Sequence, residues 1–480
     1  MKYDLLIRNA TVIDGTRAPR FRADVGVMDG KIVHIGNAEG NSAHEEFDAS
    51  GLVASPGFID AHTHDDRLML SAPDMAPKVS QGVTTVVAGN CGVSLAPTPR
   101  RMPTPVTPPL DLLDVEGAWF RFKTFRDYVG ALGEAPPATN CMLLVGHSML
   151  RVQAMDDLEK PASAAEVTRM RQLADEALEA GAIGVSTGLY YEPARAATTE
   201  EVIEVCRPLS ARNGIYCTHM RDEGARIVDS LEETFRIGRE LGVPVVVSHH
   251  KLSGKANHGR STETLPMIEK AMRSQKIGLD CYPYCASSTI LSYDRTLGAT
   301  KTLVTWSQPL PEYSGMDLKE VAGKMGCSVE DAVNRLLPAG AIYFAMDEKD
   351  VQRILGFEHT MIGSDGLPHD AAPHPRLWGT FPRVLGHYAR ELGVFTLEVA
   401  VYKMTGLAAK TFGLVDRGVL KEGHAADITL FDAGTVDEAA TFEKSIQPAR
   451  GIHTVIVNGA PVWRGGKPTG ARPGRVLQRQ

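Results

Sequence analysis

Eight short apolar runs recur along the middle of the chain, and each one ends in polar or metal-binding residues. They comprise residues 53–64, 84–91, 141–147, 182–187, 215–219, 244–249, 277–284 and 360–365. Each run is rich in β-branched or aliphatic residues, which predicts a β-strand. Helix-like stretches such as 164–180 and 230–241 lie between most of them. Alternating strands and helices predict a parallel sheet, and eight such units over roughly 350 residues predict a (β/α)8 barrel.

Side chains that can bind a metal gather at the ends of these runs. His62 and His64 close the first run, and residues two apart in a strand share a face, so both can reach one cation. Four later runs also end in a possible ligand, namely Cys91, His219, His249 and Asp365. The carboxyl ends of barrel strands converge on one site. The sequence therefore predicts a metal at the mouth of the barrel.

Composition excludes several classes of protein. The 480 residues are 43% hydrophobic, which is enough for a large core and more than one domain. The 51 basic and 58 acidic residues form no basic stripe, which argues against a nucleic-acid partner. No apolar run reaches the length of a membrane span, and none near the N-terminus forms a signal peptide. The seven cysteines have no regular spacing, which indicates a reducing, cytoplasmic location.

The two ends of the chain predict a second unit. Residues 1–55 alternate apolar and polar positions around a tight hairpin signal at 28–31, and similar β-forming segments return near the C-terminus. We expect a small β-sandwich domain of residues 1–55 and 415–480, and a barrel of residues 56–414. The seventh and eighth runs are separated by about 75 residues, too many for a simple crossover. This stretch predicts an insert at about 286–345 that forms a lid or binds substrate.

Several motifs resemble those of a known superfamily. Residues 56–64 and 423–427, the strand-end histidines and Ser364-Asp365 look like the amidohydrolase superfamily over nearly the whole chain. Within it, the sequences at 89–92, 218–221, 248–251 and 363–366 resemble the D-aminoacylases, the N-acyl-D-amino-acid deacylases. Cysteine as a metal ligand on the second strand is their distinguishing mark. The fourth run contains no lysine to bridge two metals, which weakens a dihydroorotase or hydantoinase interpretation.

The resemblance implies zinc-dependent hydrolysis of N-acyl-D-amino acids. A thiolate and two imidazoles suit zinc. The ligands expected at the tight site are Cys91, His219 and His249. A weaker neighbouring position, which the resemblance implies is partly occupied or empty, would use His62, His64 and Asp365. Asp365 would also move the proton from the attacking water to the leaving nitrogen.

The substrate-binding residues predicted from the resemblance are Lys251, Tyr282 and Arg376, which would hold the α-carboxylate of a small N-acyl amino acid. Arg295 follows the seventh run and would pair with a second carboxylate, so N-acyl-D-glutamate is the favoured substrate. Alternatively, Arg295 pairs within the protein with Asp294 or another acid. The side-chain pocket would then be apolar and favour substrates like D-leucine.

Other interpretations remain open at this stage. Cys91 could be a packing thiol and Asp365 a helix cap. Lys251 could be solvated, and His147 could line the site or serve the structure, whereas His250 is expected to be structural or to support a ligand. Isoaspartyl dipeptidase, cyclic-imide hydrolase and non-catalytic assembly protein are the alternative functions. The sequence gives no indication of the oligomeric state.

Overall fold

The structure is a computed structural model that describes residues 2–99 and 102–480. Eight parallel strands form its central sheet. In spatial order they are β6 (Phe58–Asp60), β7 (Val83–Ala88), β8 (Asn140–Gly146), β9 (Gly184–Gly188), β10 (Ile215–His219), β11 (Val245–Val247), β12 (Ile277–Cys281) and β16 (Thr360–Ile362). The last strand returns to the first, because the Ala61 amide donates to the Ile362 carbonyl and Thr63 bridges to Gly366. The predicted (β/α)8 barrel is confirmed.

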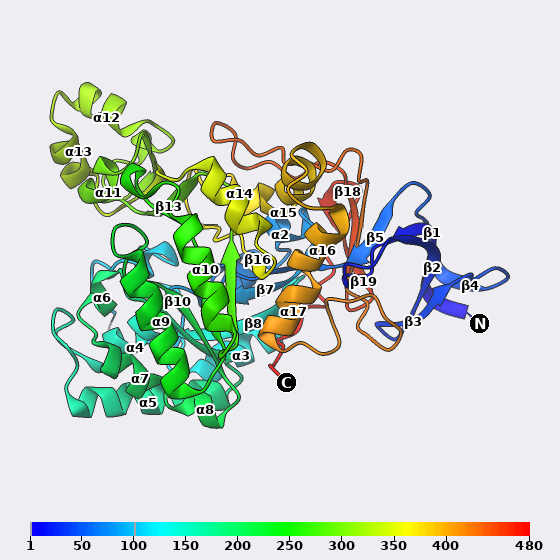
Figure 1. Cartoon of the computed structure of the whole chain (residues 1–480), viewed down its shortest axis with the longest axis horizontal. Helices are drawn as coiled ribbons and strands as arrows, with labels where there is room; N and C mark the ends of the chain where they lie inside the picture. Colours follow the sequence, from blue (N-terminus) through cyan, green and yellow to red (C-terminus); the bar gives the residue numbers. More distant parts are fainter. Residues whose placement is uncertain (1, 100–101) are drawn as a thin grey trace.

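Helices cover the barrel between the strands (Figure 1). The longer ones are α3 (Phe125–Glu134), α4 (His147–Ala154), α5 (Ala164–Glu179), α7 (Thr199–Cys206), α9 (Ile227–Leu241), α10 (Ser261–Met272), α14 (Glu348–Gly356), α15 (Arg376–Arg383), α16 (Leu397–Met404) and α17 (Gly406–Phe412). Short helices are α1 (Leu68–Ser71), α2 (Ala76–Val79), α6 (Glu192–Arg195) and α8 (Pro208–Ala211). Helix α5 begins with a capping box between Ser163 and Glu166, which satisfies amides at its first turn. Among the described residues, none of the helices has the length and apolar character needed to cross a bilayer.

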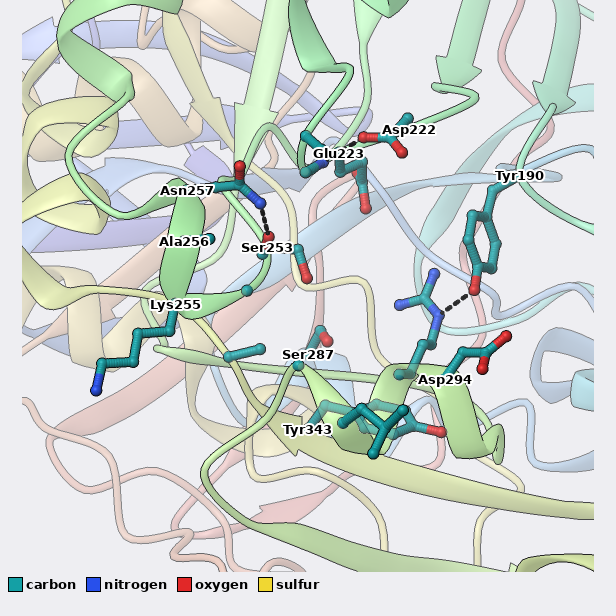
Figure 2. Close-up of a pocket in the computed structure, with 17 residues that line it drawn as sticks. Tyr190, Asp222, Glu223, Ser253, Lys255, Ala256, Asn257, Ser287, Asp294 and Tyr343 are labelled. Atoms are coloured by element: carbon teal, nitrogen blue, oxygen red, sulfur yellow. Dashed lines mark hydrogen bonds between the residues drawn. The ribbon is translucent and has the colours of Figure 1, made fainter. Parts of the chain in front are cut away.

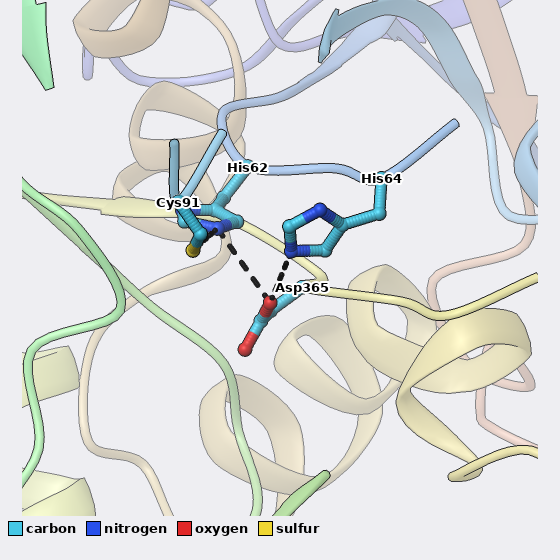
Figure 3. A group of neighbouring side chains, drawn as sticks. All are labelled: His62, His64, Cys91 and Asp365. Carbon is cyan, nitrogen blue, oxygen red and sulfur yellow. Dashed lines mark hydrogen bonds and ion pairs between the residues drawn. The ribbon is translucent and has the colours of Figure 1, made fainter. Parts of the chain in front are cut away.

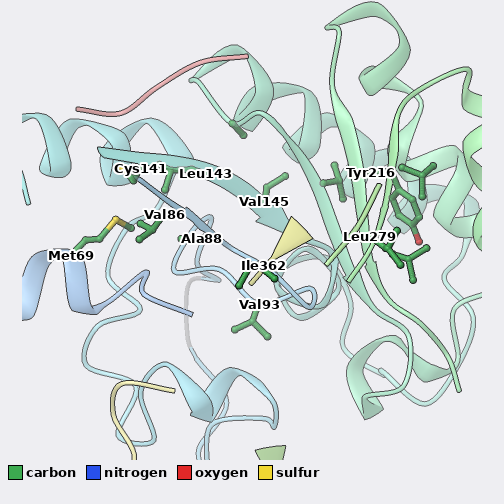
Figure 4. Packing of buried hydrophobic residues seen from close by; sticks show 14 of the residues in the cluster. Met69, Val86, Ala88, Val93, Cys141, Leu143, Val145, Tyr216, Leu279 and Ile362 are labelled. Carbon is green, nitrogen blue, oxygen red and sulfur yellow. The ribbon is translucent and has the colours of Figure 1, made fainter. Parts of the chain in front are cut away.

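Side chains of the strands alternate between two apolar layers. Val86 and Ala88 of β7 pack into the cluster between sheet and helices, with Leu143 and Ile362 (Figure 4). Val87, between them, belongs instead to the cluster that fills the barrel. This is the two-residue period of a strand that is buried on both faces. The barrel interior is therefore packed with apolar side chains.

The terminal segments form one nine-stranded sheet at one end of the molecule (Figure 1). Its strands are β1 (Lys2–Val12), β2 (Phe21–Met28), β3 (Lys31–Gly36), β4 (Ser42–Asp48), β5 (Val53–Pro56), β17 (Ile428–Phe431), β18 (Ile452–Val457), β19 (Ala460–Arg464) and β20 (Lys467–Pro468). The expected hairpin joins β2 to β3, and both Asp29 and Gly30 have the positive φ that such a turn needs. The division of the chain into a β-sandwich domain of residues 1–55 and 415–480 and a barrel of residues 56–414 stays a prediction.

The first apolar run is divided between the two sheets, where the sequence predicted one strand. Its first part, β5, pairs with β1 and β17, and its second part, β6, pairs with β7 in the barrel. The division falls at Gly57, where a Cβ would lie 2.1 Å from Thr84 Cγ2. Only glycine allows this close approach, so the chain can pass from one sheet to the other here.

The segment after the seventh barrel strand forms a small layer of its own. It contains the antiparallel strands β13 (Ala286–Ile290), β14 (Thr302–Ser307) and β15 (Ala339–Phe344), with helices α11 (Tyr293–Leu297), α12 (Leu318–Met325) and α13 (Val329–Leu336). These elements lie at the end of the molecule opposite the terminal sheet (Figure 1). An apolar cluster around Val304, Val333 and Tyr343 holds them together. Helix α11 contains Arg295.

One buried lysine, Lys403, contacts the N-terminal end of β16, where the strand begins at Thr360. Lys403 is 1% exposed, and its Nζ donates to the carbonyl oxygens of Phe357 and Thr360 at 2.5 and 3.4 Å. Burial lowers the pKa of Lys403 to about 7. Above that pH the unfolded chain binds more protons here than the folded chain, so stability rises with pH.

We therefore expect Lys403→Met to remove part of the pH dependence of stability. Lys403 should add up to about 1.4 kcal/mol per pH unit to the free energy of unfolding between about pH 7 and pH 9. Denaturant unfolding of both proteins at several pH values measures the difference, in which the other titrating groups cancel. Parallel curves for wild type and variant would contradict this assignment.

Candidate metal centre

Six side chains converge at the mouth of the barrel in two groups. One group contains His62, His64, Cys91 and Asp365 (Figure 3), and the other contains Cys91, His219 and His249. Within each group the candidate ligand atoms lie within 4.8 Å of one another, and all six residues are buried. Cys91 belongs to both groups. The structure thus brings together every metal-binding residue predicted from the sequence.

Three of these residues have an unusual backbone conformation. The φ angles are +55° at Cys91, +36° at His249 and +52° at Asp365, and all three residues lie just beyond the ends of their strands. The sequence runs placed them within the strands, but a left-handed residue departs from the extended backbone of a regular strand. Non-glycine residues in this region are uncommon and are concentrated at functional sites. At these turns the three side chains come close to the other candidate ligands.

The first group combines residues that follow the first and the last strand of the barrel sheet, β6 and β16. Asp365 Oδ1 lies 3.2 Å from His64 Nε2 and 3.5 Å from His62 Nε2. His62 Nε2 also lies 3.3 Å from the sulfur of Cys91. On its other side, His62 Nδ1 is 3.5 Å from Asp280 Oδ1. This carboxylate can fix the ring orientation of His62, as carboxylates commonly do for metal-binding histidines.

The second group has the donor atoms that zinc prefers. Cys91 Sγ lies 3.3 Å from His249 Nε2, and neither ring nitrogen of the buried His219 has a hydrogen-bond partner among the described residues. Buried imidazoles normally have hydrogen-bond partners, and a metal ion bound to His219 would supply the missing interaction. Burial would raise the pKa of the Cys91 thiol, but the imidazoles of His62 and His249 outweigh it and hold that pKa well below its ordinary value. These contacts therefore favour the thiolate form of Cys91, which is the form that binds metals.

Glu223 connects the second group to a substrate-binding candidate, and the sequence analysis missed it. Its Oε1 lies 2.9 Å from His249 Nδ1 and 2.6 Å from Lys251 Nζ, and its Oε2 lies 3.7 Å from His219 Nε2. Burial opposes ionisation, but the charge of Lys251 and the two imidazoles keep the pKa of Glu223 well below its ordinary value. Its position four residues after His219, in the loop beyond β10, was the available signal.

Asp280 was also missed, because it lies inside a strand and not at its end. Besides contacting His62, its Oδ1 accepts a hydrogen bond from the His249 amide at 2.9 Å. One carboxylate thus touches residues of both metal-binding groups. His62 follows the first barrel strand and Asp280 lies in the seventh, so it is the closure of the barrel that brings these two residues together.

Asp365 is held as a carboxylate by an arginine. Arg376 Nη1 lies 2.9 Å from Asp365 Oδ2, and both side chains are buried. Burial alone would raise the pKa of Asp365, but Arg376, His249 and His64 hold it well below its ordinary value. These contacts therefore favour the ionised form of Asp365, which has no proton of its own and can accept one.

The three residues predicted to bind the α-carboxylate lie near one another. The Arg376 guanidinium stacks 4.6 Å from the Tyr282 ring centre, and Lys251 Nζ lies 5.8 Å from the same centre. The Tyr282 hydroxyl is buried and has no hydrogen-bond partner among the described residues. Both cations already contact a carboxylate, Glu223 for Lys251 and Asp365 for Arg376. A substrate would therefore share these cations with the protein.

Two other histidines lie outside the metal-binding groups. His147, which begins α4, lies 3.5 Å from Glu201, the carboxylate that pairs with Arg151. His250 shares a hydrogen bond of 2.9 Å with the Thr264 hydroxyl. Burial lowers the pKa of His250 to about 4, so this ring is neutral. These contacts favour structural roles for both residues.

A larger cavity opens outside the metal-binding groups. Its volume is about 480 Å³, and it is lined by loops after β10 and β11 and by the insert (Figure 2). Glu223, Ser287 and Arg295 line both this cavity and the narrow space beside His64, His219 and Asp365. The two spaces are therefore neighbours, and Arg295 stands between them.

Arg295 makes no ion pair in the part of the chain that the structure describes. Its Nε donates to the Tyr190 hydroxyl at 2.9 Å, and its guanidinium lies 4.1 Å from the centre of that ring. The carboxylate of Asp294, the neighbouring acid in the sequence, is not within ion-pair distance of the Arg295 guanidinium. The guanidinium thus keeps donors for a further partner.

Comparison with known proteins identifies the family. The sequence model of the amidohydrolase family matches residues 45–284 and 337–463. The chain belongs to this amidohydrolase family. Among curated amidohydrolases from Alcaligenes xylosoxydans xylosoxydans, it is 60% identical to a D-aminoacylase, covering 99% of this chain and 98% of the relative. It is 53% identical to an N-acyl-D-aspartate deacylase (99% and 95% covered) and 45% identical to an N-acyl-D-glutamate deacylase (100% and 97%).

Solved amidohydrolase structures share this fold over their full length. A D-aminoacylase, described as having a binuclear metal centre with one-metal activation and second-metal attenuation, superimposes with a TM-score of 0.96 and 59% identity, covering 99% of this chain and 100% of the relative. The N-acyl-D-glutamate deacylase of Bordetella bronchiseptica, complexed with zinc and a phosphonate inhibitor, gives a TM-score of 0.96 and 46% identity over 100% of both chains. Metal use is thus a property of close relatives.

Proposed function

We propose that this amidohydrolase hydrolyses the amide bond of N-acyl-D-amino acids with zinc, and that N-acyl-D-glutamate is its favoured substrate. The decisive observation is the pair of metal-binding groups that share the Cys91 thiolate, with a carboxylate, Asp365, in one of them. The full-length similarity to D-aminoacylase and to two N-acyl-D-amino-acid deacylases supports the same reaction and the D configuration.

The residues present fit a zinc centre. Cys91, His219 and His249 would hold the tightly bound ion, because they offer one thiolate and two imidazoles. A second, weaker position would use His62, His64 and Asp365. When bound, zinc lowers the pKa of water to about 7 and polarises a carbonyl group.

Asp365 performs the proton transfers of this proposal. Its carboxylate accepts a proton from the water that attacks the amide carbon, and donates that proton to the nitrogen as the C–N bond breaks. The products are a carboxylate from the acyl group and a free D-amino acid. Arg376 holds Asp365 in place through Oδ2, which leaves Oδ1 facing the imidazoles of His62 and His64.

Lys251, Tyr282 and Arg376 would orient the substrate through its α-carboxylate. The Tyr282 hydroxyl has no partner among the described residues and can donate to an oxygen of the substrate. An ammonium has three donors and a guanidinium has five, so Lys251 and Arg376 can serve a substrate while keeping Glu223 and Asp365. Fixing the carboxylate fixes the distance between the amide and Asp365, which lowers the entropic cost of reaction.

Arg295 supports the preference for an acidic side chain. It lies where the metal-side space meets the outer cavity, and it has no ion-pair partner among the described residues. A second carboxylate on the substrate could bind it through two parallel hydrogen bonds. The second candidate is a deacylase for D-leucine-like substrates. The observation on the side of that candidate is the contact between Arg295 and Tyr190, which gives the guanidinium a partner within the protein.

Kinetics with Arg295→Met separate these two candidates. We expect kcat/KM for N-acetyl-D-glutamate to fall at least about tenfold, since losing about 1.4 kcal/mol of ion pairing has that effect. The value for N-acetyl-D-leucine should not fall, and N-acetyl-L-glutamate tests the configuration. Arg195→Met, which removes an exposed guanidinium from α6, is the control for the loss of a positive charge alone. Wild-type preference for D-leucine would reject the acidic substrate but keep the deacylase proposal.

A further inference from the structure

A fully buried lysine lies directly behind the first metal-binding group. Lys78 belongs to the short helix α2 and has no exposed surface. Its Nζ lies 2.9 Å from Asp60 Oδ2, 2.8 Å from the Ser364 hydroxyl and 3.3 Å from Asp65 Oδ2. The three partners come from two distant parts of the sequence. One ammonium therefore links the first and the last strand of the barrel.

Each partner of Lys78 is one or two residues away from a candidate metal ligand in the sequence. Asp65 directly follows His64 in the chain, and Asp60 lies two residues before His62. The second oxygen of Asp60, Oδ1, accepts hydrogen bonds from the amide of His62 at 3.3 Å and from the amide of Ser364 at 2.8 Å.

The same contacts reach the proposed catalytic carboxylate. Ser364 directly precedes Asp365, whose amide donates to the His62 carbonyl at 2.8 Å. The Ser364 hydroxyl also accepts a hydrogen bond of 3.3 Å from the Gly366 amide. The backbone on both sides of Asp365 is thus tied to the Lys78 network, although Lys78 is not one of the candidate ligands.

Electrostatics make this arrangement depend on the ammonium. Asp60, Asp65 and Lys78 are all fully buried, and removing one partner of a buried ion pair leaves an uncompensated charge. Without the ammonium, two carboxylates would lie close together with no cation between them. Asp60 and Asp65 would then repel each other, and the segment that carries His62 and His64 would have to shift.

We propose that Lys78 is a positioning residue. It keeps His62 and His64, beyond the first barrel strand, at the correct distance from Asp365, beyond the last. It would thereby set the affinity of the second cation position and the efficiency of proton transfer by Asp365. This inference rests on the proposed zinc-dependent deacylase function. Lys78 itself touches neither the substrate nor the candidate ligands.

The test compares Lys78→Met, Lys78→Arg and Ser364→Ala in the full-length chain. Lys403→Met is the matched control, because Lys403 is a buried lysine at the opposite end of β16. Circular dichroism establishes folding, and zinc titration against a chelator measures the first and second equivalents separately. Steady-state kinetics with N-acetyl-D-glutamate and N-acetyl-D-leucine separate kcat from KM.

For Lys78→Met we expect the second zinc equivalent to bind at least tenfold more weakly, with the first equivalent unchanged. A displacement of about 1 Å costs about 100-fold in rate, so kcat should fall by about that factor while KM changes less than about threefold. Lys78→Arg should recover part of both losses. Ser364→Ala should show a smaller loss, and Lys403→Met should show neither.

Two results would overturn the proposal. One is a folded Lys78→Met protein with wild-type kcat and wild-type affinity for the second zinc. The other is an equal loss in Lys403→Met, which would indicate general destabilisation. If Lys78→Met does not fold, unchanged kcat and zinc affinity in Ser364→Ala reject the idea. Zinc titration needs no substrate, so an inactive wild type would reject the deacylase function separately.

Discussion

Replacing Cys91 by alanine is expected to abolish tight zinc binding and leave the barrel folded. Cys91 supplies the thiolate shared by both metal-binding groups, and no other cysteine belongs to them. Losing a partner behind a metal ligand already weakens binding about 10- to 100-fold, so losing a ligand should cost more. The change removes a single sulfur atom, which opens only a small cavity. Metal analysis of the purified variant after dialysis, together with circular dichroism, measures both effects.

Cys217→Ala is the control for Cys91→Ala. Cys217 is also buried, but it packs among apolar side chains inside the barrel, and burial raises the pKa of its thiol. The two thiols thus differ in charge and not in exposure. Full zinc content in Cys91→Ala would disprove its role as a ligand, and zinc loss in Cys217→Ala would show that the method reports on stability.

The barrel was predictable because its signal is local and repeated. Each strand is buried on both faces and therefore appears as a short, continuous apolar run, and the ligands follow these runs at their carboxyl ends. Cys91, His219 and Asp365 could be chosen because residue type and position agree. The exact ends of the strands were not predictable, since the left-handed conformations of Cys91, His249 and Asp365 depend on tertiary contacts.

The supporting residues could not be predicted in the same way. Asp280 and Lys78 have no distinctive spacing relative to their partners, and Glu223 has only its position four residues after His219. An acid or lysine at such positions is usually solvated. Lys78 meets Ser364 across 286 residues, and only the closure of the barrel brings them together. Tyr190 contacts Arg295 across a gap of 105 residues. The sequence therefore suggested an acid as the partner of Arg295 and missed the tyrosine.

Asp365→Asn is expected to retain tightly bound zinc and to lose most of its turnover. The amide keeps the size of the carboxylate, and Cys91, His219 and His249 are unchanged. An amide cannot accept and return the proton, and general acid–base catalysis contributes about 10²- to 10⁴-fold, so kcat should fall by that factor. Asp370→Asn is the control, because it removes another buried carboxyl from the same loop, one whose pKa burial raises to about 7. Near-wild-type kcat in a zinc-loaded Asp365→Asn protein would exclude the proton-transfer role, whereas equal losses in both variants would assign the effect to the loop and not to the Asp365 carboxylate.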